Sequence, residues 1–238
     1  MASRSRRYAA EAIGTAFLLA AVVGSGIMGD RLAGGNAALA LLANTVATGA
    51  ALVTLLLTFG PISGAHLNPA VTIAAAWEHG LPWRDVSGYI AAQVGGALAG
   101  AAIADLMFGE PVFAFSRHMR SGPPQWLSEF VATFGLLSVI WGCSRQRSAA
   151  VPFAVAAYVT AAYWFTASTS FANPAVTLAR SLTDTFAGIR PTDVPGFILA
   201  QALGAAAATS VFRWLVPTLP ANAPRVVAPP HRRLFHGR

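Results

Sequence analysis

Apolar residues form six long runs along the chain, separated by short polar segments. The runs cover roughly Tyr8 to Met28, Ala37 to Phe59, Val86 to Phe108, Trp126 to Cys143, Ala149 to Thr166 and Val194 to Val216. Each is close to the length of about 20 residues that a helix needs to cross the apolar core of a bilayer. The pattern therefore predicts an all-α membrane protein with six transmembrane helices.

Two further apolar runs follow loops and are too short to cross a membrane. They begin with the same three residues, Asn68-Pro69-Ala70 and Asn173-Pro174-Ala175. Proline at the first helical position lacks an N–H that would have no partner there, so both triplets predict helix N-termini. A helix of about ten residues rises about 15 Å, half of the apolar thickness. Two such re-entrant half-helices that meet at the midplane predict a pore between them, because irregular backbone at that depth needs protein or a polar cavity around it.

The second half of the chain repeats features of the first. Glu11 is matched 118 residues later by Glu129, and Gln93 is matched 108 residues later by Gln201. Each half has three spans and one half-helix, so an odd number of crossings turns the second copy upside down. The sequence predicts two inverted repeats, about 8–108 and 126–216, within a channel domain 8–216. Residues 1–7 and a basic, disordered tail 217–238 would flank this domain.

Arginine placement predicts the orientation. With both termini in the cytoplasm, most of the Arg residues lie on the inner side, and only Arg31, Arg117, Arg120, Arg180 and Arg190 lie outside. Short inner loops carry such an excess of positive charge. The first half-helix then enters from the cytoplasm and the second from outside.

Composition narrows the function classes. The 238 residues are 55% hydrophobic and 11% charged, and all basic residues are Arg. The formal charge of +7 lies in loops and tails without a basic helix face, which favours topology and membrane lipids over nucleic acid as its explanation. Cys143 is the only cysteine, so an intramolecular disulfide is excluded, and a passive or a reactive thiol both remain open. No metal-ligand cluster, phosphate loop or nucleophile–base spacing is visible, so we expect neither an enzyme nor a cofactor.

The two Asn-Pro-Ala triplets, residues 68–70 and 173–175, are called the boxes below. They resemble the signature of the major intrinsic proteins, the aquaporins and aquaglyceroporins. The lead-in GPISGAH before the first box and AEAIGT near the N-terminus carry the same resemblance, which extends from about Tyr8 to Val216. It implies an aquaporin-like fold, a homotetramer with one pore per protomer, and passive passage of small neutral solutes such as water and glycerol.

Several polar residues have roles that follow from this resemblance. Asn68 and Asn173 would cap their half-helices through the side-chain oxygen and offer amide N–H groups to the pore. Glu11 and Glu129 would accept hydrogen bonds within the two re-entrant loops, with a proton relay as the alternative. His66 matches a position that lines the cytoplasmic half of the pore in relatives, although a polar group with an internal partner is the simpler interpretation.

The residue after the second box departs from the family pattern. Relatives usually have Arg there, and that Arg narrows the outer constriction; this chain has Val176. Spacing from the boxes assigns the other constriction positions to Thr48, to Ala161 or Ala162, and to Ser170. All are small or uncharged, so we expect a wider constriction without a fixed positive charge.

Arg180 lies one helical turn beyond Val176, and its side chain has two possible roles. It would restore charge in the outer vestibule, or it would instead contact protein or lipid headgroups.

The replacement of that Arg by Val resembles the AqpS-type aquaglyceroporins of bacterial arsenic-resistance operons. This resemblance implies a bacterial plasma membrane and arsenite, as the neutral hydroxide As(OH)3, among the solutes, with methylated arsenicals as further candidates. Three alternatives stay open: a water-selective aquaporin, a coupled secondary transporter built on the same kind of inverted repeat, and a scaffold protein without flux.

Overall fold

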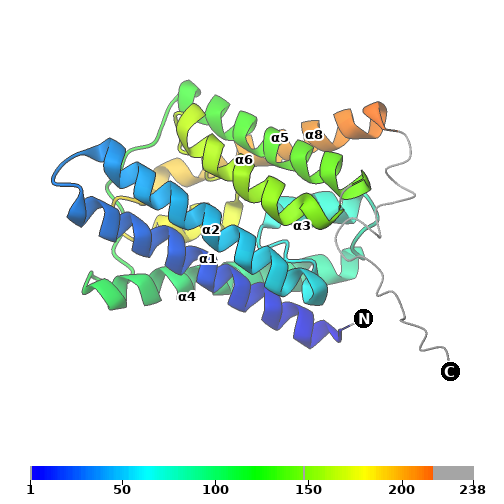
Figure 1. Cartoon of the computed structure of the whole chain (residues 1–238), viewed down its shortest axis with the longest axis horizontal. Helices are drawn as coiled ribbons and strands as arrows, with labels where there is room; N and C mark the ends of the chain where they lie inside the picture. Colours follow the sequence, from blue (N-terminus) through cyan, green and yellow to red (C-terminus); the bar gives the residue numbers. More distant parts are fainter. Residues whose placement is uncertain (1, 147, 217–238) are drawn as a thin grey trace.

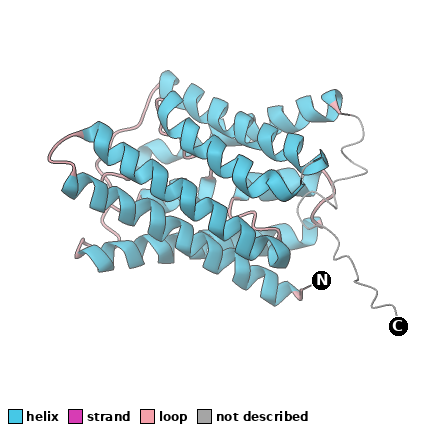
Figure 2. Cartoon of the chain, viewed as in Figure 1, coloured by secondary structure: helices cyan, strands magenta, loops and turns pink. Residues whose placement is uncertain are grey.

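A computed structural model of the chain describes residues 2–146 and 148–216, and the expected tail 217–238 lies outside this range. Every regular element of the described residues is a helix (Figure 2). The elements are α1 (Arg4–Leu32), α2 (Ala37–Ser63), α3 (Pro69–Trp77), α4 (Trp83–Phe108), α5 (Pro123–Gln146), α6 (Val151–Phe165), α7 (Pro174–Arg180) and α8 (Val194–Leu215), with short 3-10 turns at Ser148–Ala150 and Pro191–Asp193.

Six of these helices are long and apolar enough to cross a membrane, and each covers one of the six predicted runs. The prediction of six spans is therefore confirmed. Helices α1, α2, α4 and α5 extend beyond the ends of their apolar runs, whereas α6 and α8 are slightly shorter than theirs. α1 begins at Arg4 because Ser3 caps it, its side chain accepting the backbone N–H of Arg6. α2 continues to Ser63, past Pro61, and ends where Gly64 takes a left-handed conformation.

The two halves of the chain have the same internal packing. α1 packs against α2 and α4, and α5 packs against α6 and α8, as the two layers of Figure 1 show. Gly96 of α4 lies so close to the Ala12 carbonyl of α1 that a Cβ would collide with it, and Gly204 of α8 has the same relation to the Phe130 carbonyl of α5. Small residues permit this backbone approach within a membrane. The equivalence agrees with the predicted duplication.

The half-helices occupy the space between the two layers. α1 begins and α8 ends on one side of the bundle, which we call the terminus side (Figure 1, right), and the other side is called the opposite side. α3 follows α2 and enters from the terminus side, whereas α7 follows α6 and enters from the opposite side. Each half-helix packs against both α4 and α8. The two short helices thus approach one another head to head.

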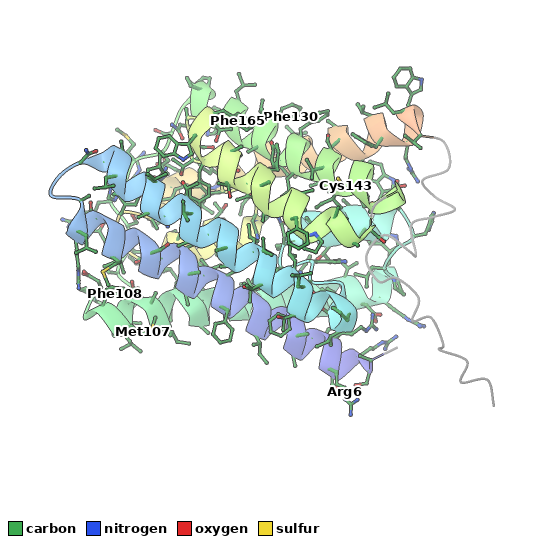
Figure 3. The ribbon with its side chains drawn as sticks, in the orientation of Figure 1. Arg6, Met107, Phe108, Phe130, Cys143 and Phe165 are labelled. Atoms are coloured by element: carbon green, nitrogen blue, oxygen red, sulfur yellow. The ribbon has the colours of Figure 1, made fainter. Side chains whose placement is uncertain are left out.

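Large apolar side chains cover the outside of the bundle. Figure 3 shows Met107 and Phe165 pointing away from it, and these side chains are 64% and 56% exposed. Polar side chains such as Glu11, Gln93 and Gln201 are instead fully buried. This distribution is the one expected for a protein whose outer solvent is lipid.

Candidate functional site

The two half-helices start with the same cap. The Asn68 side-chain oxygen accepts the N–H of Ala70 at 2.9 Å, and the Asn173 oxygen accepts the N–H of Ala175 at 3.0 Å. Each cap occupies the amide oxygen and directs the –NH2 group away from its own helix. The sequence located both helix N-termini at the correct residues.

The –NH2 groups of the two Asn residues connect the repeats. Asn68 donates from Nδ2 to the carbonyl of Ala172 at 2.8 Å, and Asn173 donates to the carbonyl of Leu67 at 2.8 Å. An amide carries two N–H groups, so each Asn retains one that is not used in this exchange. The tips of α3 and α7 are therefore in contact, with a free donor on either side.

Glu11 holds the loop that precedes α3. Its carboxylate accepts the backbone N–H groups of His66 at 3.0 Å and Leu67 at 2.7 Å. It also accepts from the Ser63 hydroxyl at 2.6 Å and from the Gln93 amide at 2.7 Å. A charge buried at 0% exposure needs such a set of donors to remain in the apolar interior.

Glu129 does the same for the loop that precedes α7. It accepts the backbone N–H groups of Phe171 and Ala172, both at 2.8 Å, and the amide of Gln201 at 2.6 Å. Ala172 has a left-handed backbone with φ of 46°, an unfavourable conformation for a residue other than glycine. Glu129 thus stabilises a strained loop.

A cavity of about 120 Å3 runs past both Asn side chains. This volume has room for several water molecules. Of the residues that the sequence indicated, those that line the cavity are Thr48, His66, Asn68, Ser170, Asn173, Val176 and Arg180. Glu11, Glu129 and the Pro and Ala residues of the boxes are not among the lining residues. The Pro and Ala residues shape the tips, and Asn68 and Asn173 are among the polar residues of the cavity wall.

Of the two candidates for one constriction position, Ala161 does not fit, and Ala162 stays a prediction. Ala161 is exposed on the outside of α6, and Ala162 is buried but does not line the cavity. The lining residues of α6 are Val151, Val155, Val159 and Tyr163. They recur every four residues and so lie on one helix face. Ala161 is rotated away from that face, whereas Ala162, three residues after Val159, lies on it without being among the lining residues. Tyr163 is bulky but uncharged, and it is a lining residue that the sequence did not indicate.

Arg180 lies at the end of the cavity nearest the opposite side. Its side chain is buried, with the residue 2% exposed, which rules out contact with lipid headgroups. Nε donates to the carbonyl of Ala187, and the guanidinium carbon is 3.4 Å from the ring centroid of Phe171. Arg180 therefore has a protein contact and also lines the cavity, which combines two of the options that the sequence left open.

His66 combines the two roles considered for it. Its Nδ1 lies 3.1 Å from the Thr72 hydroxyl, and its ring packs against Tyr89 with centroids 5.3 Å apart. The same residue lines the cavity on the terminus side of Asn68. A satisfied internal hydrogen bond thus fixes the ring beside the cavity.

The sequence matches the family model described as "Major intrinsic protein" over residues 1–151. It is 58% identical over 212 residues to the aquaglyceroporin AqpS of Rhizobium meliloti (strain 1021), which covers 89% of this chain and 91% of that protein. It is 31% identical over 227 residues to aquaporin Z of Bradyrhizobium diazoefficiens, which covers 88% of this chain and 93% of the relative.

Among solved structures, the fold is similar to the aquaglyceroporin from Plasmodium falciparum. The TM-score is 0.67, and the match covers 92% of this chain and 100% of that one at 18% identity. At this identity the likeness concerns the fold alone. It extends over both halves of the chain.

Proposed function

The chain belongs to the major intrinsic protein family and forms a multi-pass membrane channel for small solutes, and from this premise we propose that it passes small uncharged hydroxylated molecules passively. The observation that carries this proposal is the cavity beside Asn68 and Asn173, where each amide keeps one free N–H. Glycerol, water and arsenite as As(OH)3 are the solutes we expect.

Passage would depend on a few donors within apolar walls. The oxygen of a neutral solute accepts from the two Asn amides in the middle of the cavity, where the positive ends of α3 and α7 also meet. Cations are repelled by those helix ends. Leu52 and Leu136 are among the apolar lining residues, and they offer no replacement for the hydration shell of an ion.

Arsenite fits this description because arsenous acid is uncharged at neutral pH and carries three hydroxyl groups, like glycerol. Val176 is buried at the cavity wall and adds neither charge nor a long side chain there. Methylated arsenicals remain candidates for the same reason. Tyr163 places a bulky side chain at the cavity wall, with its hydroxyl 3.4 Å from that of Thr48, and this favours the second candidate, a water-selective channel.

A coupled transporter is less well supported than a channel. Coupling to protons or ions needs an ionisable group on the solute path. Glu11 and Glu129 are fully buried, accept several hydrogen bonds each, and do not line the cavity. This arrangement supports a structural duty for both carboxylates.

Stopped-flow light scattering on proteoliposomes tests the proposal. We expect water, glycerol and arsenite fluxes well above those of empty liposomes, linear in solute concentration and independent of a proton gradient. Water flux without glycerol flux would favour the water-selective candidate. Saturation at micromolar solute, or dependence on the proton gradient, would favour a coupled transporter.

We further propose that the terminus side faces the cytoplasm of a bacterial cell and that the protein is a homotetramer in the plasma membrane. Arg4, Arg7, Arg84 and Arg213 lie at helix ends on the terminus side, as expected for short inner segments. The tetramer rests on family resemblance. Labelling of introduced cysteines with a membrane-impermeant reagent, in intact cells and in inside-out vesicles, tests the orientation.

Replacement of Asn173 by Asp is expected to admit cations. The change puts a carboxylate at the meeting point of the half-helices and removes the Nδ2 donor to the Leu67 carbonyl. We expect sodium uptake into proteoliposomes about tenfold above that of the unmodified protein, since about 1.4 kcal/mol less barrier suffices. Asn36→Asp is the control because Asn36 caps α2 at the exposed surface. Ion exclusion unchanged in Asn173→Asp would contradict the central role of this residue.

Replacement of Thr48 by Phe is expected to shift selectivity toward water. Thr48 is 2% exposed, lines the cavity, and has its hydroxyl 3.4 Å from that of Tyr163. A second aromatic ring there should reduce glycerol flux by about tenfold and water flux less, because a tenfold loss needs only about 1.4 kcal/mol. Thr54→Phe places the same ring on the exposed face of α2 and serves as the control. An unaltered ratio of glycerol to water flux would show that Thr48 does not limit passage.

A further inference from the structure

Two arginines near the opposite-side end of the cavity lack a carboxylate partner within the described residues. Three other arginines on that side are paired: Arg31 with Glu110, Arg117 with Asp184, and Arg190 with Asp193. For Arg120 and Arg180, residues 2–146 and 148–216 provide no carboxylate within ion-pair distance. Arg180 is buried and Arg120 is half-buried. A buried cation without a counter-ion in contact is costly.

Arg180 directs unused donors toward the cavity. Its Nε is bonded to the carbonyl of Ala187, and the described part of the chain offers no hydrogen-bond acceptor to its two terminal nitrogens. The residue is 2% exposed and lines the cavity. A guanidinium carries five N–H groups, so four of those on Arg180 are available to a guest.

Arg120 lies beside this end of the cavity, in the loop between α4 and α5, and contacts the lining residue Phe171 without being a lining residue itself. Its Nε donates to the carbonyl of Gly188 at 2.8 Å and its Nη1 to the carbonyl of Ser168 at 3.2 Å, which leaves Nη2 unused. Its guanidinium carbon is 5.2 Å from the ring centroid of Phe171, the ring against which Arg180 also packs. Both guanidinium carbons therefore lie close to the same ring, and their separation cannot exceed these two distances added together.

A backbone hydrogen bond holds the loop that carries Arg120. The backbone N–H of Arg120 donates to the Asp193 carboxylate at 2.8 Å, which anchors the loop to the start of α8. Burial lowers the pKa of the Arg120 guanidinium from its ordinary value, although an arginine remains protonated at neutral pH. The negative charge of Glu129 acts in the other direction and raises this pKa, but burial has the larger effect, so an anion in contact would still stabilise the guanidinium.

Ser170 supplies a third unused donor. It is 4% exposed and lines the cavity, and its hydroxyl has no hydrogen-bond partner. Ser170 directly precedes Phe171 in the chain, so this hydroxyl belongs to the same end of the cavity. Unsatisfied buried hydroxyls are uncommon in native structures, and many of them mark the place of a ligand or water.

We propose that the opposite-side end of the cavity binds a small oxyanion, with Arg180, Arg120 and Ser170 as donors, and that the bound anion obstructs the passage of neutral solutes. Guanidinium groups match the oxygen geometry of phosphate-like anions. The anion would stop there, because the apolar walls further in cannot replace its hydration. Its effect on flux depends on the proposed permeation of neutral solutes, whereas its binding does not.

Inorganic phosphate titrated into the full-length protein in lipid nanodiscs tests binding directly, with calorimetry as the readout. We expect saturable binding that weakens about tenfold in Arg120→Gln and in Arg180→Gln, because each loses charge-assisted hydrogen bonds. Arg117→Gln is the matched control: it removes the same charge from the same loop, but Arg117 is exposed and holds the pKa of the Asp184 carboxyl below its usual value. Arg120→Lys keeps the charge without the planar fork, so intermediate binding is expected.

Flux gives the second, independent readout. Phosphate on the opposite side should reduce glycerol flux at least threefold relative to gluconate at equal ionic strength, and phosphate on the terminus side should not. Each variant is compared with its own flux in gluconate, so a changed basal rate does not confuse the result. No phosphate binding to the unmodified protein, or equal binding in Arg117→Gln, Arg120→Gln and Arg180→Gln, would overturn the proposal. Binding without any glycerol flux in gluconate would overturn the proposed function and leave the site in place.

Discussion

Replacement of Val176 by Arg is expected to reduce glycerol and arsenite flux by about tenfold or more while water flux falls less, since each 1.4 kcal/mol of added barrier is worth a factor of ten. Val176 is 5% exposed and lines the cavity one helical turn before Arg180. The new side chain would begin about 6 Å along the helix axis from that of Arg180, in a space that already holds unpaired positive charge. Both bulk and charge then oppose a solute with several heavy atoms.

Stopped-flow light scattering with each solute measures this effect. Val176→Met is the control for bulk alone, because Met is longer than Val but uncharged. We expect Val176→Met to give a smaller loss than Val176→Arg. Equal loss of water, glycerol and arsenite flux in Val176→Arg would contradict the assignment of this residue to the limiting constriction.

Replacement of Glu129 by Leu is expected to abolish flux and to lower the thermal stability strongly. The change leaves the N–H groups of Phe171 and Ala172 without an acceptor in a buried loop, and each such group costs about 1–3 kcal/mol. The amide of Gln201 loses the same partner. Together these losses are a large part of the roughly 5–15 kcal/mol that stabilises a typical protein.

Thermal unfolding in detergent, followed by flux through the protein that survives reconstitution, measures the effect. Glu129→Gln retains one oxygen acceptor and should be intermediate. Glu110→Gln removes a carboxylate from a more exposed pair with Arg31, and such pairs contribute about 1 kcal/mol or less. Glu129→Leu with the stability and flux of the unmodified protein would show that the carboxylate does not support the loop.

The spans and the half-helices could be predicted from sequence because their causes are local. Twenty apolar residues suffice to cross a bilayer, and Pro69 and Pro174 mark helix starts through the missing N–H alone. The equivalent positions of Glu11 and Glu129 in the two repeats could be predicted as well, since a carboxylate is rare within a transmembrane helix. These features depend on short stretches of chain and can therefore be predicted without knowledge of the fold.

Tyr163 was missed because its position depends on the loop after α6. Counting back eleven or twelve residues from Asn173 gives Ala161 or Ala162. Thr169 and Ser170 have left-handed backbones with φ of 61° and 51°, so the number of residues in this loop does not determine how far along the cavity a residue of α6 lies. The four-residue spacing from Val151 to Tyr163 was the signal that could have found it. Periodicity within a helix is a better guide than distance across a loop.

Arg120 was missed for a different reason. Its place beside Phe171 depends on contacts between two loops that are distant in sequence: Ser116 donates to the Ser181 carbonyl at 3.0 Å, and Arg190 donates to the His118 carbonyl at 2.7 Å. Backbone pairing of this kind leaves no pattern in the amino-acid sequence. The proximity of Arg120 and Arg180 to the same ring can therefore be recognised only in the three-dimensional structure.

The exchange of bonds between Asn68 and Ala172, and between Asn173 and Leu67, has a consequence for biosynthesis. The partners are 104 and 106 residues apart, and the acceptor for Asn68 leaves the ribosome after five of the six spans. The first re-entrant segment must therefore wait in the translocon or the lipid with an unpaired amide until the later segment arrives. The centre of the molecule is therefore completed only once the second re-entrant segment has joined the first.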